Sequence, residues 1–310
     1  MSFSTQVKNE LARLQPNKRC CQRAELSAIL RMDGSFHIRN GAFAFHTLAE
    51  NAAVARKTLK LFSSLSDIKL RLEVKRSIFQ KANDYILFIP PQPELYRILM
   101  DLEILNADRQ IIYGIVTELV RRSCCAITYL RGAFLGGGFI NDPRKKYHFE
   151  LTTDDSQFAL DLKDLLERFE INAKIFQKRK YVIYLKEAEQ ILRFLALVGA
   201  FNAVLKWEDI RILKEMRNQV NRLVNCDTAN LNKVVEATLT QISDITLIEE
   251  EVSLYSLSKG LREVAQARIQ FPYVSLRELG ELCNPPLSKS AVYHRMRRLN
   301  QIAKNLREGK

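Results

Sequence analysis

The sequence predicts an α+β fold, in which a duplicated αββαββα N-terminal domain precedes an all-α helix-turn-helix domain. Three observations support this prediction. The pair Cys20-Cys21 recurs 104 positions later as Cys124-Cys125, and apolar and glycine positions around the two pairs match at the same offset. Each half alternates helical and strand-like hydrophobic periods in the same order. After about residue 205 only helical patterns remain.

The constant offset defines the extent of the duplication. It maps Gly34 onto Gly138, together with many apolar positions on either side. Matches over so many positions indicate a repeated unit rather than one large domain. The copies are expected over about 18–104 and 122–204, which makes residues 1–205 one domain of two repeats.

Each repeat is predicted to contain a helix, two strands, a second helix, two more strands and a closing helix. The expected helices are 22–32, 50–64 and about 93–103 in the first copy, and 126–136, 154–169 and about 187–198 in the second. The expected strands are GSFHIR, AFAFHTL, IKLRLEVK and DYILFI, and then GFIND, KYHFELT, NAKIFQK and YVIYLK.

The C-terminal third is predicted to be helical throughout. Residues 206–252 form a helical linker, in which SDITLIEEE is either an acidic break or a continuation of the helix. Residues 253–310 form the helix-turn-helix domain. Its first helix covers 275–283, with Ser275 as N-cap, and ends at the sequence Asn-Pro-Pro that follows.

The second helix of this pair carries the strongest functional signal. Val292, Met296 and Leu299 recur at helical spacing and are expected to face inward. The second helix of a helix-turn-helix inserts its N-terminal part into the DNA major groove. The predicted DNA-binding residues are therefore Ser288, Lys289, Ser290, Tyr293, His294, Arg297 and Arg298. Arg295 and Lys304 are expected to contact phosphates. The alternative to a helix-turn-helix is a basic helical hairpin within a bundle.

The composition favours a polyanionic partner. The 310 residues include 48 Lys and Arg against 35 Asp and Glu, a net charge of +13, which favours nucleic acid first and an anionic membrane surface second. The chain shows neither a secretory signal at its N-terminus nor a membrane-spanning apolar run. These features point to the cytoplasm, with association with the nucleoid.

The six cysteines show no CxxC spacing. Paired zinc ligands are typically separated by two to four residues, whereas here two pairs are directly adjacent. The cysteines are therefore interpreted as reduced, packed thiols, and neither a metal site nor a cofactor is predicted.

The segments LSAILRMDG (26–34) and LRGAFLGGG (130–138) occupy matching places in the two repeats. Over roughly residues 20–200 the chain resembles the LAGLIDADG homing endonuclease family, in which two such helices pack together and the sheets form a saddle over DNA. The resemblance implies a metal-binding acid before each final glycine. Asp33 fills the first position and Gly137 the second, so the site is expected to be vestigial, with no catalytic residues.

The resemblance also implies that the saddle could bind DNA. Basic stretches fall on the strands and hairpins of the second repeat, and alternation places Lys174, Phe176 and Lys178 on one strand face. The candidate saddle contacts are Lys145, Lys146, Lys174, Lys178 and Lys180. The alternatives are a solvated outer sheet face and a scaffold that binds proteins.

Two C-terminal stretches resemble the signature of the WhiA family. They are NRLVNCDTANLNKVVEA (221–237) and SLRELGELCNPPLSKSAVYHRMRRL (275–299). That resemblance implies a degenerate LAGLIDADG-like domain joined to a helix-turn-helix similar to the promoter-reading part of sigma factors. It implies a non-enzymatic regulator acting in transcription control, in sporulation in some relatives, and in cell division or chromosome segregation. The expected partners are double-stranded DNA and a sigma factor or other regulatory protein. No membrane is expected among the partners. The alternatives are a metal-dependent homing-type nuclease and a protein adaptor with incidental DNA binding.

Overall fold

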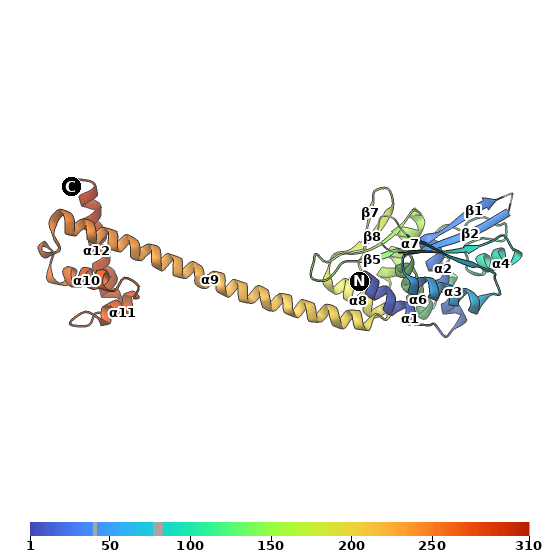
Figure 1. Ribbon diagram of the computed structural model, residues 1–310, viewed down its shortest axis with the longest axis horizontal. Coiled ribbons are helices and arrows are strands. Elements are labelled where there is room, and N and C mark those ends of the chain that lie inside the picture. The colour runs from blue at the N-terminus through green and yellow to red at the C-terminus, as the bar shows by residue number, and fades with distance from the viewer. Residues whose placement is uncertain (40–41, 77–82, 310) are drawn as a thin grey trace. The chain divides into compact units, whose positions relative to one another are not determined.

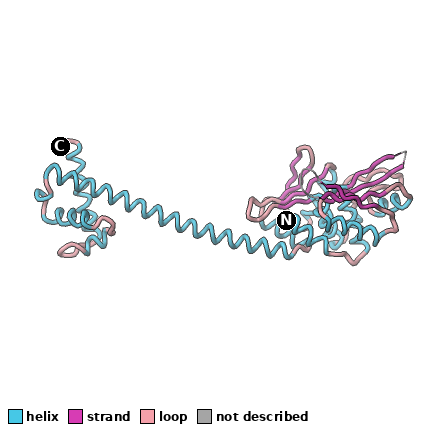
Figure 2. Tube along the Cα trace, in the orientation of Figure 1, coloured by secondary structure: helices cyan, strands magenta, loops and turns pink. Residues whose placement is uncertain are grey.

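The computed structural model describes residues 1–39, 42–76 and 83–309, and the chain forms two compact units (Figure 1). Unit 1 is Met1–Lys214 and unit 2 is Glu215–Lys310. Within the described residues, strands occur in unit 1 alone (Figure 2). No helix in these ranges is both long enough and apolar enough to cross a lipid bilayer.

Unit 1 contains the predicted duplication. The first repeat consists of α2 (Arg19–Asp33), β1 (Gly34–Arg39), β2 (Ala42–Ala49), α3 (Ala52–Leu65), β3 (Arg71–Arg76), β4 (Asn83–Ile89) and α4 (Pro93–Asp101). The second consists of α6 (Ser123–Gly137), β5 (Gly138–Ile140), β6 (Phe149–Thr153), α7 (Ser156–Glu167), β7 (Lys174–Gln177), β8 (Tyr181–Leu185) and α8 (Ala188–Val198), after the short α5 (Thr117–Val120). The antiparallel sheets have equivalent strand orders, β1-β2-β4-β3 and β5-β6-β8-β7, which confirms the predicted fold class.

The central helices α2 and α6 pack backbone to backbone because small residues line their contact. A Cβ added at Gly132 of α6 would lie 2.3 Å from the carbonyl oxygen of Glu25 and 2.9 Å from the Cβ of Ala28. Any side chain at this position would force the helices apart. The close approach explains why the second repeat has glycine where the first has alanine.

The helix α1 (Phe3–Arg13) precedes the first repeat and was not predicted from the sequence. Its N-cap is Ser2, whose hydroxyl accepts a hydrogen bond from the backbone N–H of Thr5 at 3.1 Å. Phe3, Val7 and Leu11 recur every four residues and are buried in the core of unit 1. The spacing of these three residues was the available signal for this helix.

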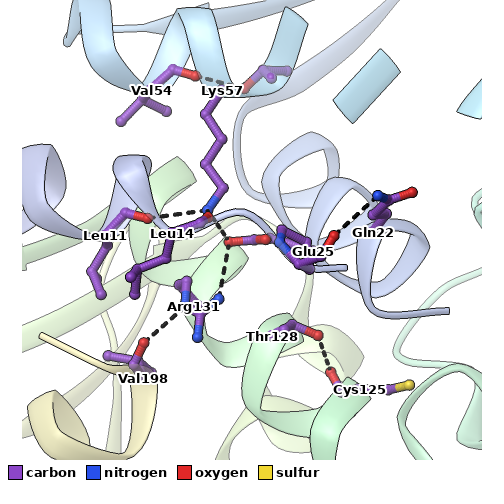
Figure 3. A network of polar contacts seen from close by, with 12 residues as sticks. Leu11, Leu14, Gln22, Glu25, Val54, Lys57, Cys125, Thr128, Arg131 and Val198 are labelled. Atoms are coloured by element: carbon purple, nitrogen blue, oxygen red, sulfur yellow. Dashed lines mark hydrogen bonds and ion pairs between the residues drawn. The ribbon is translucent and has the colours of Figure 1, made fainter. Parts of the chain in front are cut away.

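A buried ionic network joins the helices α1, α2, α3 and α6 of unit 1 (Figure 3). The Lys57 ammonium lies 2.7 Å from Glu25 Oε1 and donates to the backbone carbonyls of Leu11, at 3.1 Å, and Leu14. Arg131 Nη1 lies 4.0 Å from the same Glu25 oxygen. Neither Lys57 nor Glu25 exposes any side-chain surface. Burial raises the pKa of Glu25, although Lys57 and Arg131 oppose that effect.

The helix α9 (Phe201–Val252) is continuous through the predicted linker. No proline or glycine interrupts it, and SDITLIEEE continues the helix rather than breaking it. Its first turns bury Ala203 and Trp207 in unit 1, and its last turns bury Ile245 and Ile248 in unit 2. α9 therefore contributes to both hydrophobic cores.

Unit 2 completes the chain with the 3₁₀ turn η1 (Leu254–Ser256) and the helices α10 (Lys259–Gln270), α11 (Leu276–Glu281) and α12 (Lys289–Arg307). These elements share one core with the end of α9. Its buried apolar residues are Ile245, Ile248, Leu254, Leu261, Val264, Ala265, Leu279, Cys283, Val292, Met296, Leu299 and Ala303. This small core fixes the angle between α11 and α12 on which a helix-turn-helix depends.

Candidate nucleic-acid interface

The first helix of the predicted helix-turn-helix has its expected cap. The Ser275 hydroxyl accepts from the Glu278 N–H at 3.3 Å, and the Ser275 N–H donates to Glu278 Oε2 at 2.8 Å. These reciprocal bonds form a capping box, which satisfies two backbone donors that the helix itself leaves unpaired. α11 then ends at Glu281, just before the Asn-Pro-Pro sequence.

The turn between α11 and α12 requires glycine at position 280. The Leu287 N–H donates to the Gly280 carbonyl at 2.8 Å, so the turn folds directly back onto α11. A Cβ at Gly280 would lie 2.2 Å from the carbonyl oxygen of Leu287, a backbone atom that cannot yield independently. Ser288 caps α12 by accepting from the Ala291 N–H at 3.2 Å. The caps at both helix starts were predicted from the sequence, whereas the contact at Gly280 was not.

α12 divides into a buried and an exposed face. Val292, Met296 and Leu299 are buried, as predicted. The seven candidate DNA-binding residues all lie at exposed positions: Ser288, Lys289, Ser290, Tyr293, His294, Arg297 and Arg298. The rings of Tyr293 and His294 pack edge to face, with centroids 5.8 Å apart. The N-terminal half of the helix therefore presents cationic, aromatic and hydroxyl groups to solvent.

Arg295 does not join the other cations of α12. It is half-buried, and its Nη1 donates to the carbonyl of Gly260 on α10 at 3.4 Å. This contact ties α12 to α10, so Arg295 helps to orient the helix, and its expected contact with phosphate stays a prediction. Sequence spacing alone did not separate it from its exposed neighbours Arg297 and Arg298.

Polar contacts also anchor the C-terminal half of α12. The buried Asp244 of α9 accepts from Asn300 Nδ2 at 2.6 Å, and its second oxygen lies 2.7 Å from Arg307 Nη2. The buried Arg268 of α10 donates to the carbonyl of Val274 at 2.8 Å, before α11. These anchoring residues were not predicted, because an isolated Asp or Arg on a helix gives no sequence signal of burial.

Asp33, the first vestigial position, lies in a pocket at the ends of α2 and α6. The pocket is also lined by Lys8 of α1 and by Glu50, Glu150 and Lys180. Burial raises the pKa of Asp33 to about 6; Glu50 adds to this effect, while Lys8 and Lys180 oppose it. Burial in turn lowers the pKa of Lys8. A lysine from the unpredicted helix α1 thus accompanies the single acid.

Gly137, the position at which the family resemblance implies a second acid, lies against Met32 and Thr152. A Cβ there would lie 2.5 Å from Met32 Cε and 3.1 Å from the carbonyl oxygen of Thr152. Within residues 1–39, 42–76 and 83–309, Asp33 belongs to no group of three or more His, Cys, Asp or Glu side chains close enough to share a metal ion. Glu50 and Glu150 line the same pocket without forming such a group with Asp33.

We expect Asp33→Asn to stabilise unit 1 at pH 8 by about 1–2 kcal/mol, because it removes a carboxylate whose charged form burial disfavours. The folded pKa of about 6 lies above the unfolded value of 3.8. Between pH 3.8 and about 6, the Asp33 carboxyl is ionised in the unfolded chain but still protonated in the folded chain. The free energy of unfolding of the wild type therefore falls as the pH rises through this window. The difference in free energy of unfolding between Asp33→Asn and the wild type therefore grows from about pH 4 to about pH 6 and is constant at higher pH.

Urea unfolding followed by tryptophan fluorescence measures this effect, because the single tryptophan, Trp207, is buried in unit 1. Asp164→Asn, at an exposed position of α7, is the matched control and is expected to change little. An Asp33→Asn variant less stable than the wild type at pH 8 would contradict the prediction.

The candidate saddle lysines lie on different segments of the second repeat. Lys145 and Lys146 are exposed in the loop between β5 and β6, while Lys174 is exposed on β7. β7 ends at Gln177, so Lys178 lies in the following bend and not on the strand face with Lys174, contrary to the prediction. Lys180 lies 3.0 Å from Asp154 Oδ2 and is partly neutralised by that carboxylate.

The outer face of the first sheet carries a histidine pair that the sequence did not single out. The rings of His37 on β1 and His46 on β2 stack with centroids 4.2 Å apart. They line a shallow pocket together with Arg71 and Lys75 of β3. Burial lowers the pKa of His46, and the neighbouring His37 and Lys75 lower it further. At neutral pH His46 therefore adds little charge to that face.

Three family models match the chain in succession. Residues 19–105 match the WhiA N-terminal LAGLIDADG-like domain, 126–217 the WhiA LAGLIDADG-like domain and 220–303 the WhiA C-terminal HTH domain. The chain is 44% identical over 310 residues to the probable cell division protein WhiA of Desulfitobacterium hafniense (strain Y51), covering 99% of this chain and 97% of that protein. It is 45% identical over 314 residues to the protein of the same name from Desulforamulus reducens, covering 100% and 98%.

The crystal structure of full-length WhiA from Thermatoga maritima matches with a TM-score of 0.58 and 25% identity, over 98% of this chain and 99% of that one. The isolated N-terminal LAGLIDADG domain of WhiA matches with a TM-score of 0.51 and 22% identity, over 64% and 90%. The three domain models and the full-length relatives agree in order and extent. The chain belongs to the WhiA family.

Proposed function

We propose that this protein is a non-enzymatic DNA-binding regulator that contacts double-stranded DNA through the N-terminal half of α12. The observation that carries the proposal is the exposure of Lys289, Tyr293, His294, Arg297 and Arg298 on the side of α12 that faces away from its core. Cations and polar side chains on such a helix can reach base edges and phosphates in the major groove. The net charge of +13 favours the same partner.

The relatives named probable cell division protein WhiA support a role in cell division. We extend this proposal to transcription control and chromosome segregation, to action at the nucleoid, and to sporulation in organisms that form spores. Unit 1 would then modulate DNA binding or hold a regulatory protein such as a sigma factor. The ion pair of Lys180 with Asp154, which partly neutralises one candidate saddle contact, is consistent with these roles.

Two observations favour a binding protein over a nuclease. Two carboxylates that converge on metal ions can stabilise the attacking and leaving oxygens of a phosphodiester. Here Asp33 is the only acid at the two helix ends, and Met32 and Thr152 crowd the position where Gly137 replaces the second. The pocket also holds Lys8, Lys180, Glu50 and Glu150, but among the described residues Asp33 forms no group with other acids close enough to share a metal ion.

Genome-wide mapping of bound sites tests the proposal. We expect discrete sites for the full chain and their loss for a chain truncated after Lys214, which keeps the whole of unit 1, including the buried Trp207, but lacks α12. In a parallel assay with magnesium and supercoiled plasmid, the full chain is expected to leave the plasmid intact. Retention of the same sites by the truncated chain would contradict the proposal, as would plasmid nicking that Asp33→Asn abolishes.

A further inference from the structure

Four cysteine thiols meet where the two central helices of unit 1 begin. Cys20 and Cys21 lie at the start of α2, and Cys124 and Cys125 at the start of α6. The four Sγ atoms all lie within 4.8 Å of one another. Across the described ranges of the chain, no other group of three or more His, Cys, Asp or Glu side chains comes close enough to hold a metal ion.

The spacing of these sulfurs suits a single tetrahedral ion. A zinc ion bonded to four thiolates at about 2.3 Å places the sulfurs about 3.8 Å apart. Cys124 Sγ and Cys125 Sγ are already 4.0 Å apart, so small side-chain movements would close the shell. A cluster of several irons would need a wider cage, because metal and sulfide atoms would lie between the four thiolates.

The surroundings can compensate the net negative charge of such a site. Lys18 and Arg122 are the N-cap residues of α2 and α6, and neither side chain makes a capping hydrogen bond. Helix N-termini stabilise thiolates, as do neighbouring cations. The Arg122 side chain contacts the Cys20 thiol directly.

The site combines a buried and a more accessible side. Cys21 and Cys125 are buried, whereas Cys20 and Cys124 are half-buried. Cysteine binds zinc as the thiolate, so a bound ion would displace the thiol protons. Metal affinity should therefore rise with pH.

We propose that Cys20, Cys21, Cys124 and Cys125 bind one zinc ion, with two thiolates from each repeat. Four protein ligands complete a tetrahedral shell, so the site is structural rather than catalytic. The ion would fasten the two repeats together at the start of α2 and α6. Asp33 and Gly137 lie at the other ends of these helices, about 20 Å away along each axis.

Cobalt(II) provides a spectroscopic test on the full chain. The reduced protein, freed of metal with a chelator, is titrated with Co²⁺. We expect thiolate-to-cobalt charge-transfer bands and visible bands typical of tetrahedral coordination, saturating at one ion per chain and abolished by Zn²⁺. Zinc is also expected to protect the four thiols from a thiol reagent, leaving the exposed Cys226 reactive. It should raise the midpoint of thermal unfolding measured by Trp207 fluorescence.

Single substitutions identify the ligands. Cys20→Ser and Cys124→Ser, each at a half-buried position, are expected to abolish the cobalt bands and the thermal shift, while Cys226→Ser and Cys283→Ser preserve both. A wild-type chain that gives no cobalt bands when fully reduced would overturn the proposal, whether or not the variants fold. Bands that survive in both Cys20→Ser and Cys124→Ser would overturn it as well.

Discussion

Lys57→Met is expected to destabilise unit 1 by about 3–5 kcal/mol, the cost of breaking a fully buried ion pair. The substitution would leave the Glu25 carboxylate without the ammonium that now lies 2.7 Å away. Arg131, at 4.0 Å, is too distant to replace it. The carbonyls of Leu11 and Leu14 would also lose a buried donor.

Urea unfolding followed by Trp207 fluorescence measures this loss, since the tryptophan is buried in the same unit. Lys60→Met is the matched control, because Lys60 lies on α3 one turn from Lys57 but is exposed. Its effect is expected to be below about 0.5 kcal/mol. If Lys57→Met and Lys60→Met lower the free energy of unfolding equally, the buried ionic network of Figure 3 does not stabilise unit 1.

A double-mutant cycle separates the ion pair from the packing of its side chains. Glu25→Leu with Lys57→Met removes both charges and restores an apolar contact. The double variant is expected to be more stable than Lys57→Met alone, because it leaves no buried carboxylate without its ammonium partner, and Arg131 still donates to the carbonyl of Val198. Additive losses would show that the two residues act independently.

Combining Lys289→Ala with Arg297→Ala is expected to weaken DNA binding by at least tenfold, because each exposed cation should contribute about 1–3 kcal/mol if it contacts a base or phosphate. Both residues lie outside the core of unit 2, so the fold should persist. The double variant should also show a smaller salt dependence, with the slope of log K against log salt reduced by about one per lost phosphate contact.

Fluorescence anisotropy with a fragment from a mapped site, measured at several salt concentrations, gives both quantities. Arg193→Ala on α8 is the control, since it removes an exposed cation from unit 1. Far-UV circular dichroism verifies that α12 is still helical in the double variant. Unchanged affinity and salt slope would exclude these two side chains from the DNA interface and favour an adaptor function.

The helix-turn-helix could be predicted from the sequence because its determinants are local. A helix start depends on residues three positions apart, and Ser275 and Ser288 cap α11 and α12 as expected. Helical spacing assigned Val292 to the core and Arg297 to solvent. The duplication was equally visible, since matching patterns recur at one constant offset.

Tertiary packing decided the features that depend on distant partners. Glu25 on α2 and Lys57 on α3 are separated by two strands, and nothing local indicates that both are buried. Arg295 differs from Arg297 only in facing α10. Burial of a charged side chain depends on which element covers it, and short-range spacing carries no such information.

The cysteines show most clearly which features the sequence determines and which depend on tertiary packing. The sequence by itself determined that an adjacent pair occurs once in each repeat, and adjacent cysteines lack the spacing expected of paired zinc ligands. Only the packing of α2 against α6 brought the four sulfurs within 4.8 Å of one another. The physical reason is that a coordination shell assembled from two repeats depends on how the helices cross, whereas a local spacing rule describes the ligands of a single segment.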